Sequence, residues 1–268
     1  MKKHNLRTLK TYKKTANKRP LQMLTCYDYQ SAQMLNDTTL DLILVGDSLG
    51  NVILGYETTI QVTIEAMSLF SGAVKRGAPD KFVVGDLPFG TYATLEKGIE
   101  NAIKLFQESK VEAVKLEGAA PLHLELIERL TQTGIPVMGH IGLTPQSVHQ
   151  LGGYYTHGKD ISSAQRLMDA ALSLEKAGAF AVVLECVTPE VSKEITSQLS
   201  IPTIGIGSGD EVDGQVLVTN DLLQLGAERP PKFCTPVANL HEVKKNLVQK
   251  YLNSFEEKSH EGHESLYH

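Results

Sequence analysis

Shortages of cysteine, proline and long hydrophobic runs exclude several classes of protein. Of the 268 residues, three are Cys and 11 are Pro, and Pro and Gly together number 33. Disordered, collagen-like and small disulfide-rich chains are therefore excluded. The longest apolar stretches, such as residues 40–46, are much shorter than a membrane span, so we expect no membrane partner. The hydrophobic content of 41% is ample for one large globular domain or two small ones.

The three cysteines do not form a recognisable pattern. Cys26, Cys186 and Cys234 lie far apart, with no CxxC pair and no spacing typical of a metal site. Scattered cysteines of this kind indicate reduced thiols. We therefore expect a cytoplasmic protein.

Positive charge is concentrated at the start of the chain. Residues 1–20 contain eight Lys or Arg and no acid, which leaves 18 basic and 31 acidic residues, a net charge of −13, in the remainder. An acidic body repels phosphate, so we expect no nucleic-acid partner. The basic stretch also lacks the apolar core of a secretory signal. We interpret residues 1–20 as a solvated lead-in segment, 21–254 as a single domain and 255–268 as a polar tail.

Eight short apolar runs alternate with longer amphipathic stretches. Each run is nearly continuously apolar, which is typical of parallel strands that are covered on both faces. The predicted strands are residues 21–28, 40–48, 82–89, 111–118, 135–143, 179–186 and 201–209, with a weaker candidate at 215–221. Helical spacing of apolar residues predicts helices at 64–77, 95–109, 122–134 and 163–178.

This alternation predicts an α/β protein with a (β/α)₈ TIM barrel. Eight strand–helix units in about 250 residues match the usual size of that fold. The alternative is an open, doubly wound sheet, which would normally carry a glycine-rich phosphate loop after its first strand. No GxGxxG follows the first predicted strand, and GIGSGD at 205–210 lacks the third glycine and comes late in the chain.

Charged residues interrupt the apolar runs at their carboxyl ends. The active sites of barrel enzymes assemble at that face of the fold. Acidic side chains are rarely buried without a partner, so several on one rim require a cation, a substrate or shared protons. The residues concerned are Asp47, Asp86, Lys115, Glu117, His140 and Glu185.

Each of these residues also has a purely structural interpretation. Asp47 and Asp86 could cap the helices that follow them. Lys115 and Glu117 are two residues apart, so on a strand they point to the same side and could form a simple ion pair. His140 could be a hydrogen-bonded core residue. Glu185 has no cation in its local sequence, which makes it the hardest to explain structurally.

Taken together, the residues indicate metal-assisted carbonyl chemistry. Several carboxylates with few imidazoles suit a hard divalent ion, and we expect Mg²⁺. A 2-oxo acid can fill two of its open positions with carboxylate and ketone oxygens, which promotes enolisation. An acid outside the metal shell can then remove the neighbouring proton.

Two other motifs are weaker. HEGHE at 260–264 is not a zinc-protease HExxH, because its histidines are three residues apart in a polar tail. Lys115 on a barrel strand could form a Schiff base with a carbonyl substrate. The acids around it should keep it charged, which argues against a free amine nucleophile.

Long segments of the chain resemble the 3-methyl-2-oxobutanoate hydroxymethyltransferase (ketopantoate hydroxymethyltransferase) family. They follow the family's order from about Leu21 to Phe233, and the fold that the resemblance implies is a TIM barrel of the phosphoenolpyruvate/pyruvate type. Ala119 and Ser208 depart from the family pattern. The matching segments are TCYDYQSA (25–32), LVGDSLGNVILGY (44–56), GDLPFGTY (85–92), VKLEGA (114–119), MGHIGLTPQSVHQLGGY (138–154), VVLECVTPE (182–190), IPTIGIGSGDEVDGQVLV (201–218) and PKF (231–233).

The resemblance implies an activity, a set of residue roles and a partner chain. The implied enzyme of pantothenate biosynthesis transfers a one-carbon unit from 5,10-methylenetetrahydrofolate to 3-methyl-2-oxobutanoate, giving 2-dehydropantoate. The family forms large homo-oligomers, commonly decamers. The resemblance implies that Asp47, Asp86 and Glu117 form the Mg²⁺ site, partly through water. It also implies that the 2-oxo acid is contacted by Asp47, Ser48, Asp86 and Lys115, and that His140 lines the pocket. Glu185 is the implied proton acceptor.

Three other functions remain open on the residues alone. A metal-dependent carbon–carbon lyase of the same barrel type would use similar chemistry without folate. A Schiff-base aldolase would use Lys115 and no metal. A non-enzymatic barrel would not require the acids on its rim.

Overall fold

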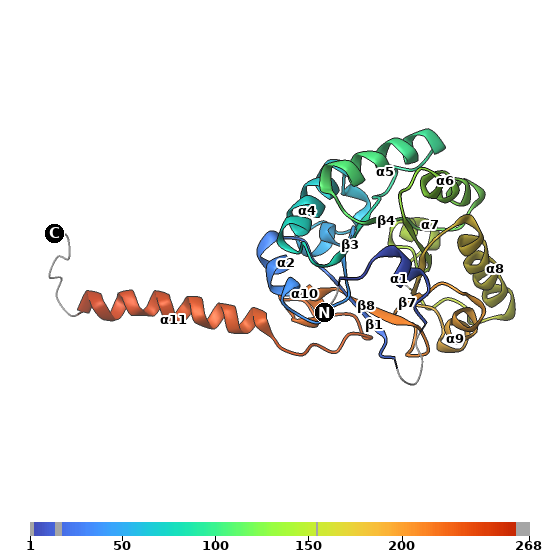
Figure 1. The fold of residues 1–268 in the computed structure, drawn as a ribbon. Helices are drawn as coiled ribbons and strands as arrows, with labels where there is room; N and C mark the ends of the chain where they lie inside the picture. The colour runs from blue at the N-terminus through green and yellow to red at the C-terminus, as the bar shows by residue number, and fades with distance from the viewer. Residues whose placement is uncertain (1–2, 14–17, 154, 261–268) are drawn as a thin grey trace. The chain divides into compact units, whose positions relative to one another are not determined.

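The chain contains a closed barrel of eight parallel strands (Figure 1). The computed structural model describes residues 3–13, 18–153 and 155–260. Strand order follows chain order and β1 pairs with β8, which confirms the predicted (β/α)₈ barrel and excludes the open doubly wound sheet. The strands are β1 (Leu21–Thr25), β2 (Leu42–Val45), β3 (Phe82–Asp86), β4 (Ala113–Lys115), β5 (Val137–Gly142), β6 (Ala181–Glu185), β7 (Thr203–Ile206) and β8 (Gly214–Leu217).

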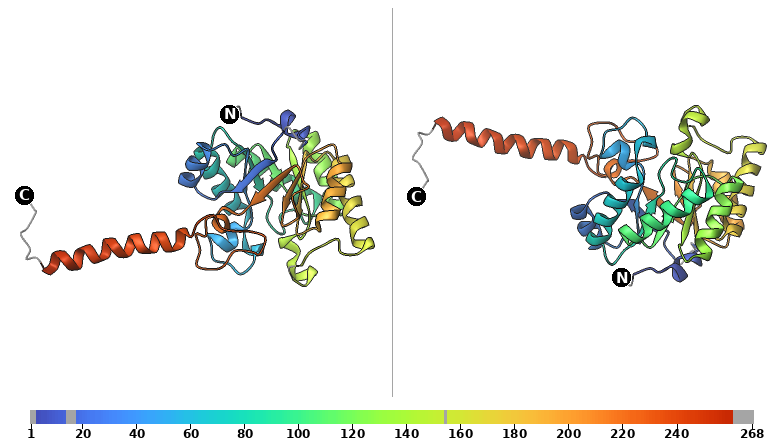
Figure 2. Two further views of the ribbon diagram at one scale, coloured as in Figure 1. Left: turned by 90° about the horizontal axis from the view of Figure 1, so that it is seen from below. Right: turned by 90° about the horizontal axis from the view of Figure 1, so that it is seen from above.

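Helices surround the barrel on its outside (Figures 1 and 2). The four helices predicted from the sequence are all present, as α4, α5, α6 and α8. Further short helices follow β2 and β5. The helices are α2 (Tyr29–Asn36), α3 (Leu49–Val52), η1 (Thr59–Gln61), α4 (Ile64–Gly77), α5 (Leu95–Ser109), α6 (Pro121–Gln132), η2 (Pro145–Ser147), α7 (Val148–Leu151), α8 (Ile161–Ala177) and α9 (Pro189–Gln198).

Local sequence sets the helix ends. Thr63, Thr94 and Asp160 precede α4, α5 and α8, and each accepts a hydrogen bond from a backbone N–H in the first turn. These side chains satisfy donors that the helix itself leaves unpaired. Gly178, at φ 105°, ends α8 in a left-handed conformation that glycine adopts without a steric penalty.

Side chains alternate between two hydrophobic layers along each strand. In β2, Leu42 and Leu44 belong to the cluster inside the barrel, whereas Ile43 and Val45 belong to the cluster between strands and helices. Period-two alternation therefore buries both faces of the strands. This explains why the strands are nearly continuously apolar.

The N-terminal segment differs from the solvated lead-in that we expected. Helix α1 (Leu6–Lys10) lies at one end of the barrel (Figure 2), where Leu9 joins the inner cluster. Lys13 Nζ lies 2.6 Å from Asp213 Oδ2, and Arg19 Nη1 lies 2.7 Å from Asp41 Oδ2. The basic residues thus pair with buried acids of the barrel, which composition alone does not indicate.

The described chain divides into two compact units, Met1–Val218 and Thr219–His268. The second unit contains α10 (Thr219–Leu222) and α11 (Leu240–His260), so a helix spans residue 255, where we expected a polar tail to begin. In the described ranges of both units, no helix has the length and apolar content required to cross a membrane. The HEGHE segment lies outside the described residues except for His260.

Candidate active site

The ends of neighbouring strands bring the predicted site residues together. Asp86, Lys115 and Glu185 are the last residues of β3, β4 and β6. Asp47 and Glu117 lie two residues beyond β2 and β4. His140 lies within β5, two residues before the strand ends at Gly142. Because parallel strands end on the same face, these side chains meet at one rim.

A buried ion pair forms one side of the cluster. Lys115 Nζ lies 2.7 Å from Asp86 Oδ1 and 3.9 Å from Glu117 Oε1, and the three side chains are at most 4% exposed. Burial opposes the charge on Lys115, but attraction by Asp86, Glu117 and Asp47 outweighs it and raises the pKa of the amine. Burial raises the pKa of Asp86 despite the attraction of Lys115. Lys115 therefore stays cationic, which does not suit a Schiff-base nucleophile.

Asp47 lies in an environment that disfavours its negative charge. Burial, together with repulsion by Glu117 and Asp86, raises its pKa to about 8 from an ordinary 3.8, although Lys115 and a hydrogen bond from the Gln146 side chain oppose this. Its backbone N–H donates to Asp86 Oδ2 over 3.1 Å. Among the described residues, no hydrogen-bond partner contacts Asp47 Oδ2, which is fully buried. A bound cation or donor would satisfy this oxygen.

His140 bridges two carboxylates. Its Nδ1 lies 3.3 Å from Glu117 Oε1, and its Nε2 lies 3.3 Å from Glu185 Oε2. Burial and nearby Lys115 disfavour the charged imidazole, but the two carboxylates outweigh them and raise its pKa to about 9. The attraction is mutual and, against burial, lowers the pKa of Glu117. His140 is therefore more than a core histidine, because it links Glu185 to the rest of the cluster.

The backbone around Glu185 is tightly constrained. Cys186, the next residue, has φ 50°. A Cβ at Gly142 on β5 would overlap the Glu185 carbonyl oxygen. The Ser208 hydroxyl donates to Leu184 O over 2.7 Å and accepts from the residue 187 N–H over 3.1 Å, so it spans the turn that carries Glu185. The Glu185 side chain, 17% exposed, is the most accessible acid of the cluster.

The capping interpretation of the two aspartates is wrong. Ser48 precedes α3 without a side-chain cap, and Thr94 caps α5. Ser48 Oγ instead lies 2.7 Å from the Tyr27 hydroxyl, beside Asp47. The ion pair expected between Lys115 and Glu117 exists, but within a larger network.

Sequence reasoning missed three polar residues around the cluster. Tyr27, Tyr92 and Gln146 lie in segments that match the family, but nothing in their local spacing marks them as site residues. Gln146 donates its backbone N–H to Glu117 Oε2 over 3.1 Å. The Tyr92 hydroxyl donates to Gln146 Oε1 over 2.6 Å.

The cluster has the charge and the oxygen donors that suit a divalent cation. Its four carboxyl groups face two cationic groups, so full ionisation leaves two negative charges. In the described ranges, no group of three or more His, Cys, Asp or Glu side chains is arranged to hold a metal ion by itself. Mg²⁺ usually takes one or two carboxylates and keeps several waters, so such a cage is not required. The orphaned Asp47 oxygen and the excess negative charge fit Mg²⁺.

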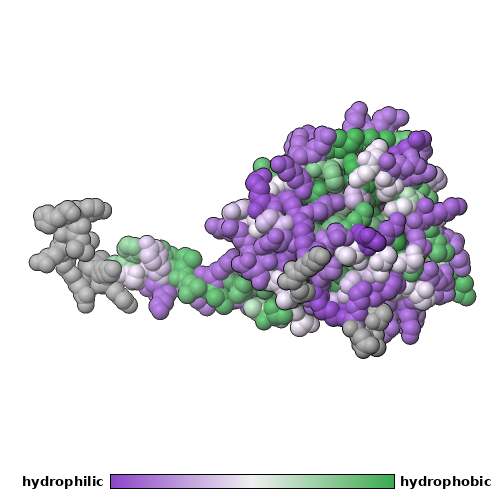
Figure 3. Space-filling model, viewed as in Figure 1, coloured by the Kyte–Doolittle hydropathy of each residue, from purple (hydrophilic) through white to green (hydrophobic). Residues whose placement is uncertain are grey.

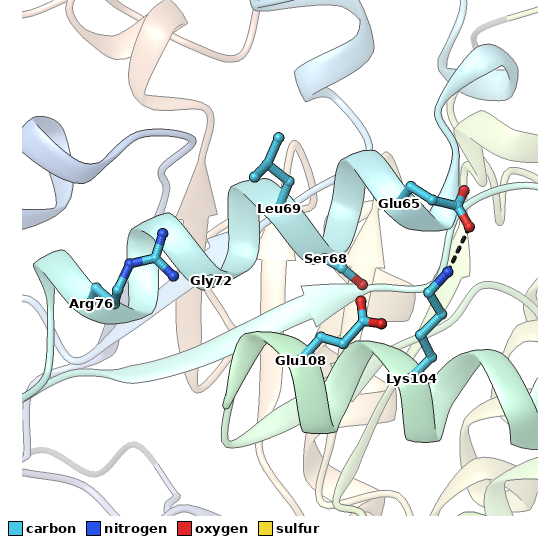
Figure 4. Close-up of a pocket in the computed structure, with 7 residues that line it drawn as sticks. All are labelled: Glu65, Ser68, Leu69, Gly72, Arg76, Lys104 and Glu108. Atoms are coloured by element: carbon cyan, nitrogen blue, oxygen red, sulfur yellow. Dashed lines mark hydrogen bonds and ion pairs between the residues drawn. The ribbon is translucent and has the colours of Figure 1, made fainter.

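A hollow between α4 and α5, lined by none of these rim residues, has a volume of about 370 Å³ (Figure 4). Its lining includes Arg76, Glu108 and the pair Lys104–Glu65, whose charged atoms are 2.6 Å apart. The Glu65 and Lys104 side chains are 67% and 35% exposed. Exposed charges of this kind are largely solvated, so we do not assign the active site there.

A barrel of this type with buried, perturbed titratable groups on its rim is the architecture of an enzyme. The solved phosphoenolpyruvate phosphomutase from Streptomyces platensis subsp. rosaceus has a similar fold, with a TM-score of 0.63 and 11% identity over 95% of this chain and 88% of that chain. The fold is thus that of the phosphoenolpyruvate mutase/isocitrate lyase barrels.

The sequence identifies the family within that class. Residues 3–262 match the model of ketopantoate hydroxymethyltransferase, and the chain belongs to this family. A 3-methyl-2-oxobutanoate hydroxymethyltransferase from Geobacillus sp. (strain WCH70) is 49% identical over 90% of this chain and 86% of its own length. The 3-methyl-2-oxobutanoate hydroxymethyltransferase from Thermotoga maritima is 52% identical over 89% of this chain and 88% of its own length. The relatives' names support ketopantoate hydroxymethyltransferase activity.

Proposed function

We propose that the protein transfers a hydroxymethyl group from 5,10-methylenetetrahydrofolate to 3-methyl-2-oxobutanoate, forming 2-dehydropantoate for pantothenate biosynthesis. The observation that carries this proposal is the placement of Glu185. Its partly accessible carboxylate lies 3.3 Å from His140, at the edge of a buried cluster of carboxylates and cationic groups where we place the cation and the oxoacid. Such a site provides a base beside an electron-withdrawing centre, which enolisation requires.

Asp47, Asp86 and Glu117 would hold Mg²⁺, in part through water. When bound, the ion would draw electrons from the ketone of the 2-oxo acid and make its C3 proton more acidic. Ser48 and the N–H groups near it, together with Lys115, would contact the oxoacid oxygens. The protein would thereby fix the ketone and C3 relative to Glu185.

The residues of the chain would then carry out the proton transfer. Glu185 takes the C3 proton, and Lys115 and His140 supply positive charge near the developing negative charge. His140 also orients the Glu185 carboxylate through its Nε2 contact. Overall, the methylene carbon gains a bond to C3 and a hydroxyl from water, and both of its bonds to folate nitrogens break. The proton taken from C3 and the remaining proton of that water pass to these nitrogens, and tetrahydrofolate leaves.

Helix α11 supports a homo-oligomer, which the family resemblance suggests is a decamer. Apolar side chains recur every four residues at Val243, Leu247, Tyr251 and Phe255, and each is at least 48% exposed. Figure 3 shows hydrophobic surface along this helix. An apolar helix face of this length is typical of association with another chain. Sedimentation or light scattering would therefore give a mass well above one chain of 29.3 kDa.

We also propose a cytoplasmic location, because Cys26, Cys186 and Cys234 are all unpaired thiols in the structure. Burial raises the pKa of Cys26 and Cys186 to about 11, which makes both poorly reactive. The proposed reaction uses only a folate and a 2-oxo acid, so it requires no nucleic-acid or membrane partner.

The decisive assay is formation of 2-dehydropantoate from purified protein, 3-methyl-2-oxobutanoate and 5,10-methylenetetrahydrofolate. We expect product only with folate, loss with EDTA and recovery with Mg²⁺. Product without folate would indicate a lyase, and EDTA resistance with borohydride trapping would indicate a Schiff-base aldolase. Glu117→Gln should abolish turnover, whereas Glu108→Gln in the hollow between α4 and α5 should not. Full turnover in Glu117→Gln would contradict the proposal.

A further inference from the structure

Two buried side chains outside the charged cluster join the loops that follow β3 and β5. Tyr92 lies after β3, and Gln146 lies in η2 after β5. The Tyr92 hydroxyl donates to Gln146 Oε1 over 2.6 Å, and the two residues are only 8% and 5% exposed. A hydrogen bond shielded from water in this way is strong and fixes both partners.

The second half of the Gln146 amide is also engaged. Its Nε2 donates to Leu87 O over 3.0 Å, so the side chain is held at both ends by residues that follow β3. This fixes the backbone of Gln146, whose N–H donates to Glu117 Oε2 over 3.1 Å. The side chain of Gln146 therefore holds its own N–H against a carboxylate of the cluster.

Tyr92 reaches the same acid by a second route. Its hydroxyl oxygen accepts from the Glu117 backbone N–H over 3.4 Å. Glu117 is thus anchored at its backbone by Tyr92 and at Oε2 by Gln146. Its other oxygen, Oε1, faces His140 and Lys115, at 3.3 and 3.9 Å. The direction of each carboxylate oxygen follows from these contacts.

We propose that Tyr92 and Gln146 are a positioning pair that orients the Glu117 carboxylate toward a divalent cation bound at this rim. The inference rests on the proposed function, because it requires that the rim bind a metal. Neither residue touches substrate in the proposed reaction, and both contact Glu117. The Gln146 side chain also hydrogen-bonds to Asp47, so its positioning role extends to a second acid of the rim. Loss of a hydrogen bond that orients a metal ligand typically weakens metal affinity about 10–100-fold.

The test is the equilibrium binding of Mn²⁺ to the full-length protein, followed by electron paramagnetic resonance of the free ion, without substrate or folate. Tyr92→Phe removes one hydroxyl, and we expect it to weaken Mn²⁺ binding about tenfold. Tyr12→Phe is a matched control at the α1 end of the barrel. Tyr12 is also 8% exposed and also donates over 2.6 Å, to Arg19 O. We expect unchanged binding in this control.

A double-mutant cycle separates positioning from general loosening of the fold. Gln146→Met keeps the side-chain volume and removes both amide hydrogen bonds, and we expect Mn²⁺ binding about tenfold weaker. Because Tyr92 and Gln146 act through one another, the double variant should also bind about tenfold more weakly, and not about a hundredfold. Thermal unfolding of Tyr92→Phe and Tyr12→Phe should differ little.

Each outcome decides the inference. Wild-type affinity in folded Tyr92→Phe and Gln146→Met would overturn it and leave the proposed function intact. Equal weakening in Tyr12→Phe would also overturn it, since this indicates general destabilisation. Additive effects in the double variant would overturn the pairing, since they indicate that the two residues act independently. Wild-type protein that binds no Mn²⁺ would refute the proposed metal site, and the positioning role with it.

Discussion

Replacing Lys115 with Met should destabilise the metal-free protein strongly. The lysine and Asp86 are 2.7 Å apart, and their side chains are 4% and 2% exposed. Removing one partner of such a buried pair leaves an uncompensated charge and typically costs about 3–5 kcal/mol. In a domain of this size, the expected fall in melting temperature is roughly 6–20 °C. Adding Asp86→Asn to the variant removes the unpaired charge and should restore part of the loss.

The matched control is Lys104→Met. Lys104 pairs with Glu65 over 2.6 Å, a similar distance, but their side chains are 35% and 67% exposed. Exposed pairs contribute about 0–1 kcal/mol. Guanidinium unfolding in EDTA at one fixed protein concentration would compare the variants. Lys115→Met within about 1 kcal/mol of Lys104→Met, with no gain from Asp86→Asn, would refute the reasoning.

Three further predictions follow from the rim. The pKa of Asp47 is about 8 in the folded protein and 3.8 ordinarily, so between these pH values the unfolded chain binds fewer protons than the folded one. The metal-free protein should therefore lose stability as pH rises from about 4 to about 8. Asp47→Asn should remove this loss in unfolding experiments, and an unchanged pH dependence would be contrary evidence. Gly142 has φ 98°, and a Cβ there would overlap the Glu185 carbonyl, so Gly142→Ala should lower the free energy of unfolding by about 3 kcal/mol or more. Gly226→Ala places its Cβ in open space and should have no such effect. Equal melting temperatures for the two variants would contradict this. Ser208→Ala should cost about 1–3 kcal/mol, because it leaves a buried N–H beside Glu185 unpaired, and wild-type stability would show that this N–H finds another partner.

The strands and most of the charged cluster could be predicted because their causes are local or topological. A strand covered on both faces must be apolar over most of its length, as β2 is throughout and β6 is up to Glu185. A polar residue at the end of such a run, such as Asp86 or Glu185, then lies at the rim because all parallel strands end there. Continuous apolar runs, together with the rule that parallel strands end on the same face, were therefore sufficient to predict the strands and these rim residues.

Contacts between distant loops could not be predicted in the same way. Tyr92 and Gln146 are 54 residues apart, and no spacing rule connects them. The pairing of Lys13 with Asp213 spans 200 residues and depends on the closed barrel. The four-residue spacing in α11 was present in the sequence, but the polar composition of this region obscured it. Single-sequence patterns record which face a residue occupies, not which loop it will meet.

Roles within the cluster also depended on the three-dimensional arrangement. His140 was expected only to line the pocket, and the structure places it between Glu117 and Glu185. Its raised pKa follows from these two neighbours, which come from different strands. The assignments of metal ligand, substrate contact and base remain predictions for experiment.

Exchange of the C3 proton of 3-methyl-2-oxobutanoate with deuterated solvent, followed by NMR without folate, tests the central claim most directly. We predict exchange by the wild-type protein with Mg²⁺, little exchange in EDTA, and none above background in Glu185→Gln that still binds Mn²⁺ and the 2-oxo acid. Exchange by Glu185→Gln at the wild-type rate would show that another group removes the proton. Exchange unaffected by EDTA would show that the acidic rim does not act through a cation.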